Sequence, residues 1–506
     1  MKKQIIIALL GIIIGAGSVI TFNKLTENRR RLKAEYQDWR KLNLVLQSVG
    51  ENYVDSVDYA KVSDAAISAA LRALDPHSVY MPPVELEEAE QDLSGGFEGI
   101  GIQFNVPNDT AIVIEAIPGG PSEKIGIRSG DRLLKVDTTV IAGVKFPQDS
   151  MVRRMKGPAG TKVLITVGRD GESIPFEVTR AKIPQHCVDA AFMLGDTTAY
   201  IRLSKFSRTT YTEVATSAKE LLDKGMRKLI LDLRDNTGGY MDQALALADL
   251  FLPKGAQIVY LQGRKRARED YKASGRGFLQ DIDLVVLIDE GSASSSEIFA
   301  GAMQDNNRAT IVGRRSYGKG LVQEPVYFSD GSGIRLTVAR FYTPRGRCIQ
   351  KEYTDDYYYE VYNRYNGGEM VEADSMKVND GGIVPDIFVP VDTTKATAFY
   401  ISCSRKATTM RFASSFFDAH REELSRIDDF DALLSFLDRS DLETGFLRYA
   451  DSVDGIKPAP GEWESNESYL MAQVRALVGR YSKLGDNAYY HLYLPVDREI
   501  HCAMKL

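Results

Sequence analysis

Residues 283–305 read DLVVLIDEGSASSSEIFAGAMQD, and this stretch decides the fold class. Its first part, 283–289, is a short apolar run, which is typical of a strand buried on both faces of a parallel sheet. Its second part, 294–305, has apolar residues at helical spacing. Ser294 stands three residues before Glu297, which is the capping-box pattern of a helix start. A strand followed closely by a helix predicts an α/β domain.

The same alternation of strand and helix occurs upstream of this stretch. Four segments show it: a strand at 198–206, a helix at 211–225, a strand at 228–234 and a helix at 241–252. Residues 310–343 then return to strand character. We therefore predict one α/β domain over 184–395, with a largely parallel sheet covered by helices on both faces.

The flanking regions have other patterns. The segment GGFEGIGIQF (95–104) is rich in glycine, and it is followed by short strand-like runs at 111–117, 132–137, 162–168 and 174–181. This predicts a small domain of strands and two short helices. With 506 residues, 44% of them hydrophobic and 26% charged, the chain is long enough for about two to four globular domains. The predicted division is a targeting segment at 1–26, a helical region at 27–93, the small domain at 94–183, the α/β domain at 184–395 and a mainly helical domain at 396–506.

Charge and side-chain chemistry exclude several function classes. The net charge is −6 and no concentrated basic face is visible, so we expect no nucleic-acid partner. The cysteines stand far apart without a C-x-x-C pair, which indicates buried thiols and leaves a single disulfide open. The five histidines are not at ligand spacing, so we predict no metal and no cofactor. The four cysteines are Cys187, Cys348, Cys403 and Cys502.

The N-terminus has the pattern of a targeting segment. After MKK, residues 5–22 are almost wholly apolar, and as a helix they would span about 27 Å of a hydrocarbon core of ~30 Å. The segment is either an uncleaved signal-anchor or a long signal peptide, and we favour the anchor because Gly17 is a poor cleavage site. We expect a cell-envelope protein, inner-membrane-anchored or exported, with its bulk on the periplasmic or extracytoplasmic side.

The serines at 292–296 raise the question of whether one of them is a nucleophile. A capping role accounts for Ser294 on spacing alone. The start of a helix also offers free N–H groups and positive potential to an oxyanion, so the position fits a nucleophile as well. The proton acceptor decides between the two. His77 lies in the helical N-terminal part, His186 at a domain edge and the other histidines in the C-terminal helices, so lysine is the alternative base.

Lys319, in GRRSYGKGLVQ (313–323), is the candidate base. A lysine base must be neutral, which requires its pKa to fall from about 10.4 to about 7 by burial away from carboxylates. No Asp or Glu occurs between 306 and 323, and Gln323 could orient the lysine without charging it. The stretch also resembles a phosphate-binding loop, but Gly320 replaces the required Ser or Thr and a strand is predicted next, so we reject nucleotide binding.

Four motifs together resemble the C-terminal processing peptidases, also called tail-specific proteases: DLRDNTGG (232–239), GSASSSEIFAGAMQDNNRATIVG (291–313), SYGKGLVQ (316–323) and GGIVPDI (381–387). The resemblance covers roughly 36–395. It implies a crotonase-like α/β protease core with a PDZ domain, Ser294 as nucleophile, Lys319 as base and Gln323 as its partner. Backbone N–H groups of Ser295 and of the Gly238–Gly239 pair would form the oxyanion hole, with Gly239 favoured and Gly238 kept as the alternative. The family often has alanine at Ser295, so we expect that change to be harmless.

The small domain resembles a PDZ domain. Its loop Gly99–Ile102, which includes Ile100 and Gly101, would bind a peptide's C-terminal carboxylate through backbone N–H groups, and the adjoining strand edge would pair with the peptide. A PDZ domain that only scaffolds remains the alternative. In bacterial members an arginine near the junction couples the PDZ and protease domains, and Arg180 is the candidate here.

Together these observations predict a serine endopeptidase that captures protein or peptide substrates by free, apolar C-termini. The alternatives are a catalytically inactive PDZ adaptor and a crotonase-like acyl-CoA enzyme, because fold alone does not fix chemistry. The presence of Ser294, Lys319 and Gln323 disfavours the inactive adaptor. The Ser294–Lys319 pair and the PDZ domain disfavour the acyl-CoA enzyme. Contact with the membrane is expected through 5–22, and homo-oligomer formation stays open.

Overall fold

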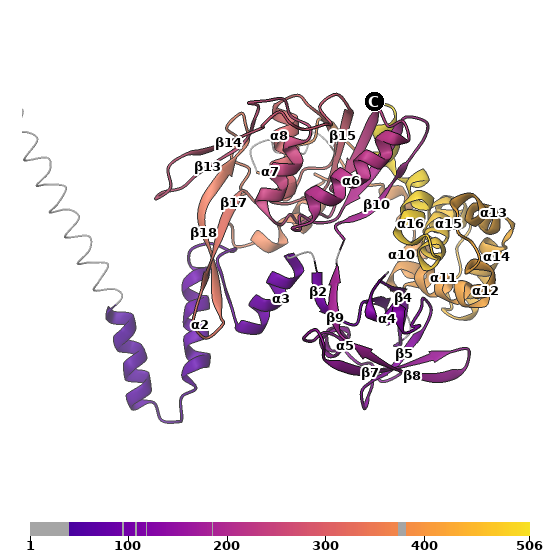
Figure 1. Ribbon diagram of the computed structural model, residues 1–506, viewed down its shortest axis with the longest axis horizontal. Helices are drawn as coiled ribbons and strands as arrows, with labels where there is room; N and C mark the ends of the chain where they lie inside the picture. The colour runs from indigo at the N-terminus through magenta and orange to yellow at the C-terminus, as the bar shows by residue number, and fades with distance from the viewer. Residues whose placement is uncertain (1–39, 94–95, 107–108, 118, 185, 373–380) are drawn as a thin grey trace, which may run out of the picture. The chain divides into compact units, whose positions relative to one another are not determined.

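The computed structural model describes residues 40–93, 96–106, 109–117, 119–184, 186–372 and 381–506. The chain divides into two compact units, Met1–Leu74 and Asp75–Leu506, whose elements are labelled in Figure 1. In the described part of the first unit, residues 40–52 are helical and α2 spans Tyr59–Arg72. Asp58 caps α2 by accepting the N–H of Lys61.

The described residues include no helix with both the length and the apolar character that a membrane crossing requires. The segment 5–22, predicted as a signal-anchor or signal peptide, lies outside the described residues.

The small domain has the predicted strands and two short helices. One sheet has the order β3-β4-β5-β7-β8, with β6 on β5, and a separate pair joins β2 to β9. Because β3 ends its sheet, one backbone edge of this strand has no partner within that sheet. The elements are β2 (Gly96–Gly99), β3 (Ile102–Asn105), β4 (Ala111–Ala116), α4 (Pro121–Lys124), β5 (Arg132–Val136), β6 (Thr139–Val140), α5 (Gln148–Met155), β7 (Lys162–Arg169), β8 (Glu172–Thr179) and β9 (Ala181–Pro184).

The α/β core contains a six-stranded sheet of order β10-β11-β12-β15-β16-β19. Only β10 is antiparallel to its neighbour, and the other pairs are parallel, as predicted. The strands are β10 (Val188–Met193), β11 (Thr198–Leu203), β12 (Lys228–Asp232), β15 (Asp283–Ile288), β16 (Thr310–Gly313) and β19 (Ile387–Phe388). The helices that follow β11, β12 and β15 are α6 (Thr210–Asp223), α7 (Met241–Asp249) and α8 (Ser295–Asp305).

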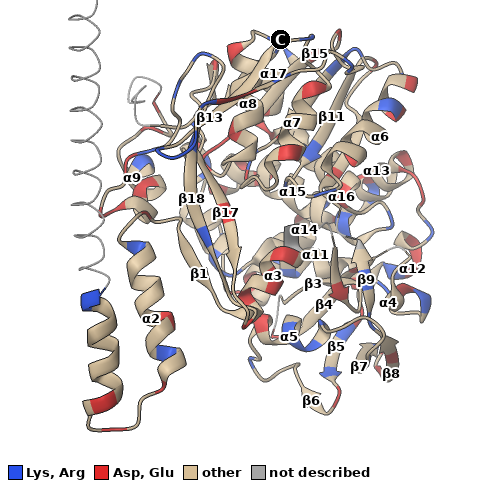
Figure 2. Ribbon diagram, turned by 60° about the vertical axis from the view of Figure 1, so that its left-hand side comes forward, with Lys and Arg blue, Asp and Glu red and all other residues tan. Residues whose placement is uncertain are grey.

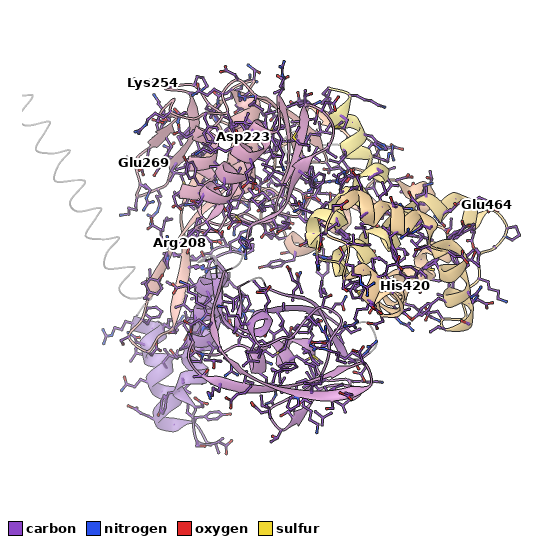
Figure 3. All side chains as sticks on the ribbon, turned by 45° about the vertical axis from the view of Figure 1, so that its right-hand side comes forward. Arg208, Asp223, Lys254, Glu269, His420 and Glu464 are labelled. Atoms are coloured by element: carbon purple, nitrogen blue, oxygen red, sulfur yellow. The ribbon has the colours of Figure 1, made fainter. Side chains whose placement is uncertain are left out.

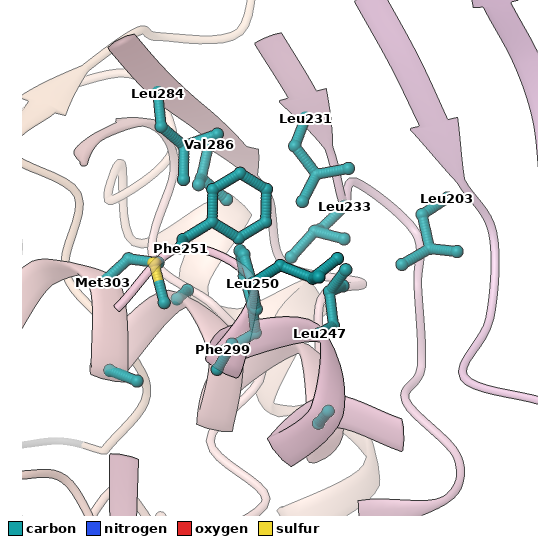
Figure 4. Close-up of a cluster of buried hydrophobic side chains, with 14 of the residues drawn as sticks. Leu203, Leu231, Leu233, Leu247, Leu250, Phe251, Leu284, Val286, Phe299 and Met303 are labelled. Atoms are coloured by element: carbon teal, nitrogen blue, oxygen red, sulfur yellow. The ribbon is translucent and has the colours of Figure 1, made fainter. Parts of the chain in front are cut away.

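Both faces of this sheet are buried, which explains the continuous apolar runs in its strands. Along β12 and β15, Leu231 and Val286 point to the face covered by α7 and α8, where Phe251 and Phe299 pack (Figure 4). The residues between them, Ile230 among others, point to the opposite face. Successive side chains along each strand therefore point alternately into two apolar cores, one on each face of the sheet.

The opposite face is covered by the end of the chain. Leu494, Ile500 and Ala503 share an apolar cluster with Ile230 and neighbouring strand residues, and Figure 2 shows α17 (Arg498–Met504) close to β15. The region 396–506 is mainly helical, as predicted, but its last helix packs on the sheet of the α/β core. The other helices are α10 (Ala398–Arg405), α11 (Thr408–Ala419), α12 (Arg421–Leu424), α13 (Phe430–Arg439), α14 (Leu442–Ser452), α15 (Glu462–Tyr481) and α16 (Gly485–Tyr493).

A second, antiparallel sheet of order β1-β18-β13-β14, with β17 on β18, adjoins the core. Charged side chains at exposed positions, such as Arg208, Asp223, Lys254 and Glu269, extend from the core elements into solvent (Figure 3). The strands are β1 (Val79–Met81), β13 (Gln257–Gln262), β14 (Glu269–Lys272), β17 (Leu321–Tyr327) and β18 (Gly333–Tyr342), and α3 (Pro83–Leu93) follows β1.

The order of the parallel strands determines where the candidate residues meet. The loops after β12, β15 and β16 carry the glycine pair, the serines and Lys319 respectively. These three strands are neighbours in the sheet. Because parallel strands end at the same edge of a sheet, their loops converge there, which is the usual position of an active site in open α/β folds.

Candidate active site

Ser294 occupies the turn between β15 and α8. Its φ of 55° lies in the left-handed region, a strained conformation for a non-glycine residue. Its N–H donates to the Glu297 carboxylate at 2.7 Å, as the capping-box pattern predicts. The flanking Ser292 and Ser296 are buried, and their hydroxyls donate to the carbonyls of Leu233 and Asn236 at 2.7 and 2.8 Å. These two serines fasten the turn to the loop after β12, as a structural role requires.

Glu297 joins the serine turn to the lysine loop. Its carboxylate is fully buried and accepts four hydrogen bonds. One oxygen, Oε2, accepts the N–H groups of Ser294 and Lys319 at 2.7 and 2.9 Å. The other, Oε1, accepts the Ser316 hydroxyl at 2.5 Å and the Gly318 N–H at 2.7 Å. Burial raises the pKa of Glu297, while these hydrogen bonds lower it. The sequence identified Glu297 only as a helix cap.

Lys319 lies in the extended loop between β16 and β17. The absence of a helix after it agrees with the rejection of a phosphate-binding loop. Burial and then the positive charge of Arg335 lower the pKa of Lys319, while Glu297 and Asp75 act in the opposite direction. The expectation of a site away from carboxylates is therefore wrong, because the nearby acids are distant in sequence. Within the described residues, the Lys319 ammonium forms no hydrogen bond to Ser294.

Gln323 is held by the segment 75–78, which sequence reasoning placed in the helical N-terminal region. Its amide nitrogen donates to the carbonyl oxygen of His77. The His77 ring contacts the Tyr357 hydroxyl, and burial together with the charge of Lys319 lowers the pKa of His77 to about 4. A neutral imidazole thus lies near Lys319. Asp75 orients this segment by accepting the N–H groups of His77 and Ser78 at 2.8 and 2.7 Å.

The two glycines after β12 differ in what their N–H groups bind. The Gly238 N–H donates to Asn236 Oδ1 at 2.9 Å. Because this N–H already has an acceptor, the prediction of Gly238 as an alternative oxyanion donor is corrected. In the described part of the chain, the N–H groups of Gly239 and Ser295 donate to no protein atom. A Cβ on Gly238 would lie 2.9 Å from the Ser294 Cβ and from the Ser295 nitrogen, so this loop touches the serine turn. The free donors therefore lie next to Ser294.

The Ser295 side chain also contributes to this arrangement. Its hydroxyl donates to the Gly239 carbonyl at 2.9 Å, and the next N–H, that of Tyr240, donates to the Phe206 carbonyl at 2.8 Å. The peptide that follows Gly239 is thus held at both ends. An alanine at 295 would remove one of these contacts, which could not be predicted because Ser295 and Gly239 lie far apart in the sequence.

In the small domain, the loop Gly99–Ile102 carries free backbone donors. The N–H groups of Ile100 and Gly101 donate to no atom of the described residues. Their carbonyls are held by Ser122 and Ile117, at 2.6 Å from the Ser122 hydroxyl and 3.0 Å from the Ile117 nitrogen. Gly101 has a φ of 72°, which glycine adopts without strain. The loop leads into β3, the strand with an unpaired edge, so carboxylate and peptide could bind together.

Among the residues that the structure describes, the Arg180 guanidinium donates only to atoms of the small domain. It donates to the carbonyls of Met155 and Arg154 at 3.1 and 2.8 Å, at the end of α5, and to Thr161 Oγ1 at 3.1 Å. It therefore binds the last carbonyls of α5 and fixes that helix to the exit of the domain. A role in coupling the two domains stays a prediction.

The cysteines are free thiols in the structure. Cys187 and Cys403 are buried, as predicted, whereas Cys348 is exposed and Cys502 is half-buried. Burial raises the pKa of Cys187 and of Cys403 to about 11, which keeps both thiols protonated and inert at neutral pH.

Comparison with known proteins gives a consistent result. The model of peptidase family S41 matches residues 197–359, and a PDZ-domain model matches 99–179. A carboxy-terminal-processing protease of Bartonella bacilliformis is 32% identical over 357 residues, which cover 69% of this chain and 81% of that protein. The carboxy-terminal processing protease CtpA of Bacillus subtilis is 31% identical over 359 residues, covering 70% and 76%.

Among solved structures, a photosystem II D1 C-terminal processing protease is 27% identical with a TM-score of 0.37, covering 68% of this chain and 86% of that one. The motifs, the PDZ domain and the extent of the sequence match agree with one another. The chain belongs to peptidase family S41 and is a serine-type carboxy-terminal processing peptidase with a PDZ domain.

Proposed function

We propose that Ser294 and Lys319 form the catalytic dyad of this peptidase. The observation that carries the proposal is that one Glu297 oxygen accepts the N–H groups of both residues, at 2.7 and 2.9 Å. A buried carboxylate with every acceptor site used keeps the two loops adjacent while leaving both side chains free to react. Structural serines, such as Ser292 and Ser296, instead use their hydroxyls in hydrogen bonds to backbone.

In the proposed reaction the Ser294 oxygen attacks the carbonyl carbon of the scissile peptide bond while neutral Lys319 accepts the hydroxyl proton. The lysine then gives this proton to the departing amine as the C–N bond breaks, which leaves an acyl ester on Ser294. Water, deprotonated by Lys319, hydrolyses the ester and restores both groups. The missing contact between the two side chains forms when substrate is bound, since catalytic hydrogen bonds commonly tighten only in the complex.

The oxyanion of the tetrahedral intermediate binds the N–H groups of Gly239 and Ser295. Both donors are free, and the Ser295 N–H lies at the start of α8, where the helix dipole favours negative charge. Gln323 is proposed to orient Lys319 from the opposite side, supported by its position on β17 and its anchor on the His77 carbonyl.

The PDZ domain is proposed to bind the substrate's C-terminus before cleavage. Support comes from the free N–H groups in the loop Gly99–Ile102 and the unpaired edge of β3. A carboxylate accepts the loop donors and the peptide adds a strand to β3, so an apolar C-terminal side chain is placed against the domain's apolar core. The same domain selects substrates by their ends, and the core cleaves them.

Three broader features complete the proposal. The core is crotonase-like, supported by its layered α/β architecture and by an oxyanion donor at a helix start. The domain limits are those predicted from sequence, with the PDZ-domain match at 99–179 inside 94–183.

The apolar segment 5–22, preceded by Lys2 and Lys3, inserts into or passes through the inner membrane and leaves the catalytic part on the extracytoplasmic side.

The decisive variant is Ser294→Ala, with Ser296→Ala as its matched control. Loss of the nucleophile should reduce cleavage of an unstructured protein with an apolar C-terminus by at least about 1,000-fold, because only binding and oxyanion stabilisation remain. Ser296→Ala should stay active. Products are measured by mass spectrometry and folding by circular dichroism. Wild-type turnover by a folded Ser294→Ala protein would exclude Ser294 as the nucleophile.

A further inference from the structure

The last helix of the chain places two acids against the loops of the proposed active site. Asp497 accepts from the Arg234 guanidinium at 2.8 Å, and Glu499 lies 3.5 Å from the same guanidinium. Glu499 also accepts from Arg314 at 2.5 Å. Arg314 in turn donates to Glu290 at 2.8 Å, so Arg314 joins the end of the chain to the serine loop.

Each core residue in this network begins a different catalytic loop. Arg234 follows β12 and precedes the oxyanion donor Gly239, while Glu290 follows β15 and precedes Ser294. Arg314 follows β16 and precedes Lys319. Asp497, which caps α17, and Glu499 on its first turn thus connect, directly or through Arg314, to all three segments that must be in register for catalysis.

These ion pairs differ from ordinary surface pairs. The side chains of Asp497 and Glu499 are 4% and 12% exposed, and those of Arg234 and Arg314 are 15% and 12% exposed. At such burial the charges are only weakly screened, and removal of one partner leaves another charge uncompensated. Asp232 also pairs with Arg234 at 2.6 Å, from the strand side, so the arginine is held between strand and helix.

Apolar packing does not replace these contacts at this edge of the sheet. A cavity of about 870 Å³ is lined by Arg234, Arg314, Asp497 and Glu499 among others. Loops that border a cavity are not fixed by close packing. Their relative positions therefore depend on polar contacts: the hydrogen bonds of Glu297, Ser292 and Ser296 on one side and these ion pairs on the other.

The helix that carries the two acids is itself firmly anchored. Ile500 and Ala503 are buried in the apolar cluster on the sheet, and the Lys228 ammonium donates to the Ala503 carbonyl at 2.6 Å. Asp497 caps the helix by accepting the Ile500 N–H at 3.0 Å. α17 can therefore serve as a fixed reference against which the loops are positioned.

We infer that Asp497 and Glu499 are positioning residues for catalysis, which hold the oxyanion, serine and lysine loops in register from the end of the chain. The inference rests on the proposed function, because it takes these loops as the catalytic ones. It gives the C-terminal helix a role in turnover in addition to its role in the core.

The test compares Glu499→Gln with Lys228→Met in the full chain. Glu499→Gln keeps the size of the side chain but loses its charge, so kcat should fall about tenfold, since small displacements of catalytic groups are costly. KM for a C-terminal peptide substrate should stay within about twofold, because Glu499 is far from the PDZ loop in the sequence and has no contact with it among the described residues. Lys228→Met removes one hydrogen bond at the end of α17 opposite Asp497 and Glu499, while the buried Ile500 and Ala503 and the Asp497 cap still hold the helix, so it should lower the thermal midpoint and leave kcat unchanged.

Labelling of Ser294 by a small fluorophosphonate gives a second readout that does not require substrate capture. Its rate should fall in parallel with kcat in Glu499→Gln and remain normal in Lys228→Met. Arg314→Lys keeps a positive charge but cannot bridge Glu290 and Glu499 in the same way, so it should reproduce the loss and serves as the second variant if Glu499→Gln does not fold.

Parallel measurement of Ser294→Ala separates the two levels of the account. An active Ser294→Ala protein would overturn the proposed dyad. An inactive Ser294→Ala protein together with normal kcat and labelling in folded Glu499→Gln and Arg314→Lys would overturn only the positioning role of α17.

Discussion

Two glycine loops of this protein carry backbone N–H groups that donate to no atom of the described residues, and we propose that they bind different anions. The donors of Ile100 and Gly101 in the PDZ loop are proposed to bind a carboxylate that the substrate carries before and after the reaction. The donor of Gly239 in the loop after β12 is proposed to bind an oxyanion that exists only during the reaction. Gly101 and Gly239 have φ values of 72° and 145°, so both loops require glycine.

The two loops also differ in how they are held. The PDZ loop has its carbonyls fixed by Ser122 and Ile117, within one small domain. The loop after β12 is bound to Phe206 in the segment that follows β11, to the serine turn and, through Arg234, to the helix at the end of the chain. Interactions made in the ground state set affinity, whereas those made only in the transition state set rate. We therefore expect changes in the first loop to alter KM and changes in the second to alter kcat.

Gly239→Ala should give the largest effect. A Cβ at this position would lie 2.1 Å from the Phe206 carbonyl oxygen, so the loop must move and its donor is misplaced. Loss of one oxyanion donor should lower kcat by about 100- to 1,000-fold with little change in KM. Steady-state kinetics well below the melting temperature check this. A variant whose KM rises while kcat is kept would place Gly239 in substrate binding.

Gly101→Ala should act on affinity. A Cβ here would lie 2.9 Å from the Ile183 Cδ1, and the positive φ adds strain. Loss of hydrogen bonds to a charged carboxylate should raise KM about tenfold and leave kcat unchanged. Gly143→Ala is the matched control, because Gly143 has a φ of 70° and open space around it.

The same contrast extends to the substrate. In wild type a peptide with an amidated C-terminus should bind more weakly than the free acid, and Gly101→Ala should reduce that preference. Equal KM values for acid and amide in wild type would mean that the loop does not select C-termini.

Ser295→Ala should have the smallest effect. It removes the hydrogen bond to the Gly239 carbonyl but keeps the Ser295 N–H, so kcat should fall about fivefold, which corresponds to about 1 kcal/mol. Ser402→Ala loses a similar hydroxyl-to-carbonyl bond, an exposed one to Ala398 in α10, and should leave kcat unchanged. Wild-type kcat in Ser295→Ala would mean that this side chain does not support the oxyanion loop.

Local pattern was enough to predict much of the fold. The apolar runs at 228–234 and 283–289 became buried parallel strands because both faces of the sheet are covered. The capping pattern at Ser294 marked the start of α8, and convergence of the loops follows from the carboxyl ends of adjacent strands.

Contacts between distant segments could not be predicted in this way. His77 contacts Gln323 across a separation of 246 residues, and Asp497 and Glu499 reach loops that lie far earlier in the sequence. Nothing in the spacing of these residues signals such partners, since burial and ion pairing arise only after folding. The prediction of an oxyanion donor could not be narrowed from Gly238 and Gly239 to one residue either, because it depends on the hydrogen bond from the Gly238 N–H to Asn236, which only the folded loop shows.

The central claim is that neutral Lys319 is the base, and the pH dependence of kcat/KM tests it most directly. Burial and Arg335 hold the pKa of Lys319 below its usual range, so the neutral form gains population as pH rises through that lowered value. Activity should therefore rise with pH to a plateau.

Arg335→Gln removes one cause of the lowered Lys319 pKa and should move the rise in activity to higher pH, whereas Arg340→Gln, at an exposed position of the same strand, should not. Lys319→Arg should be inactive at every pH, because arginine does not lose its proton. An active Lys319→Arg enzyme, or a wild-type profile that falls as pH rises from neutrality, would contradict the account.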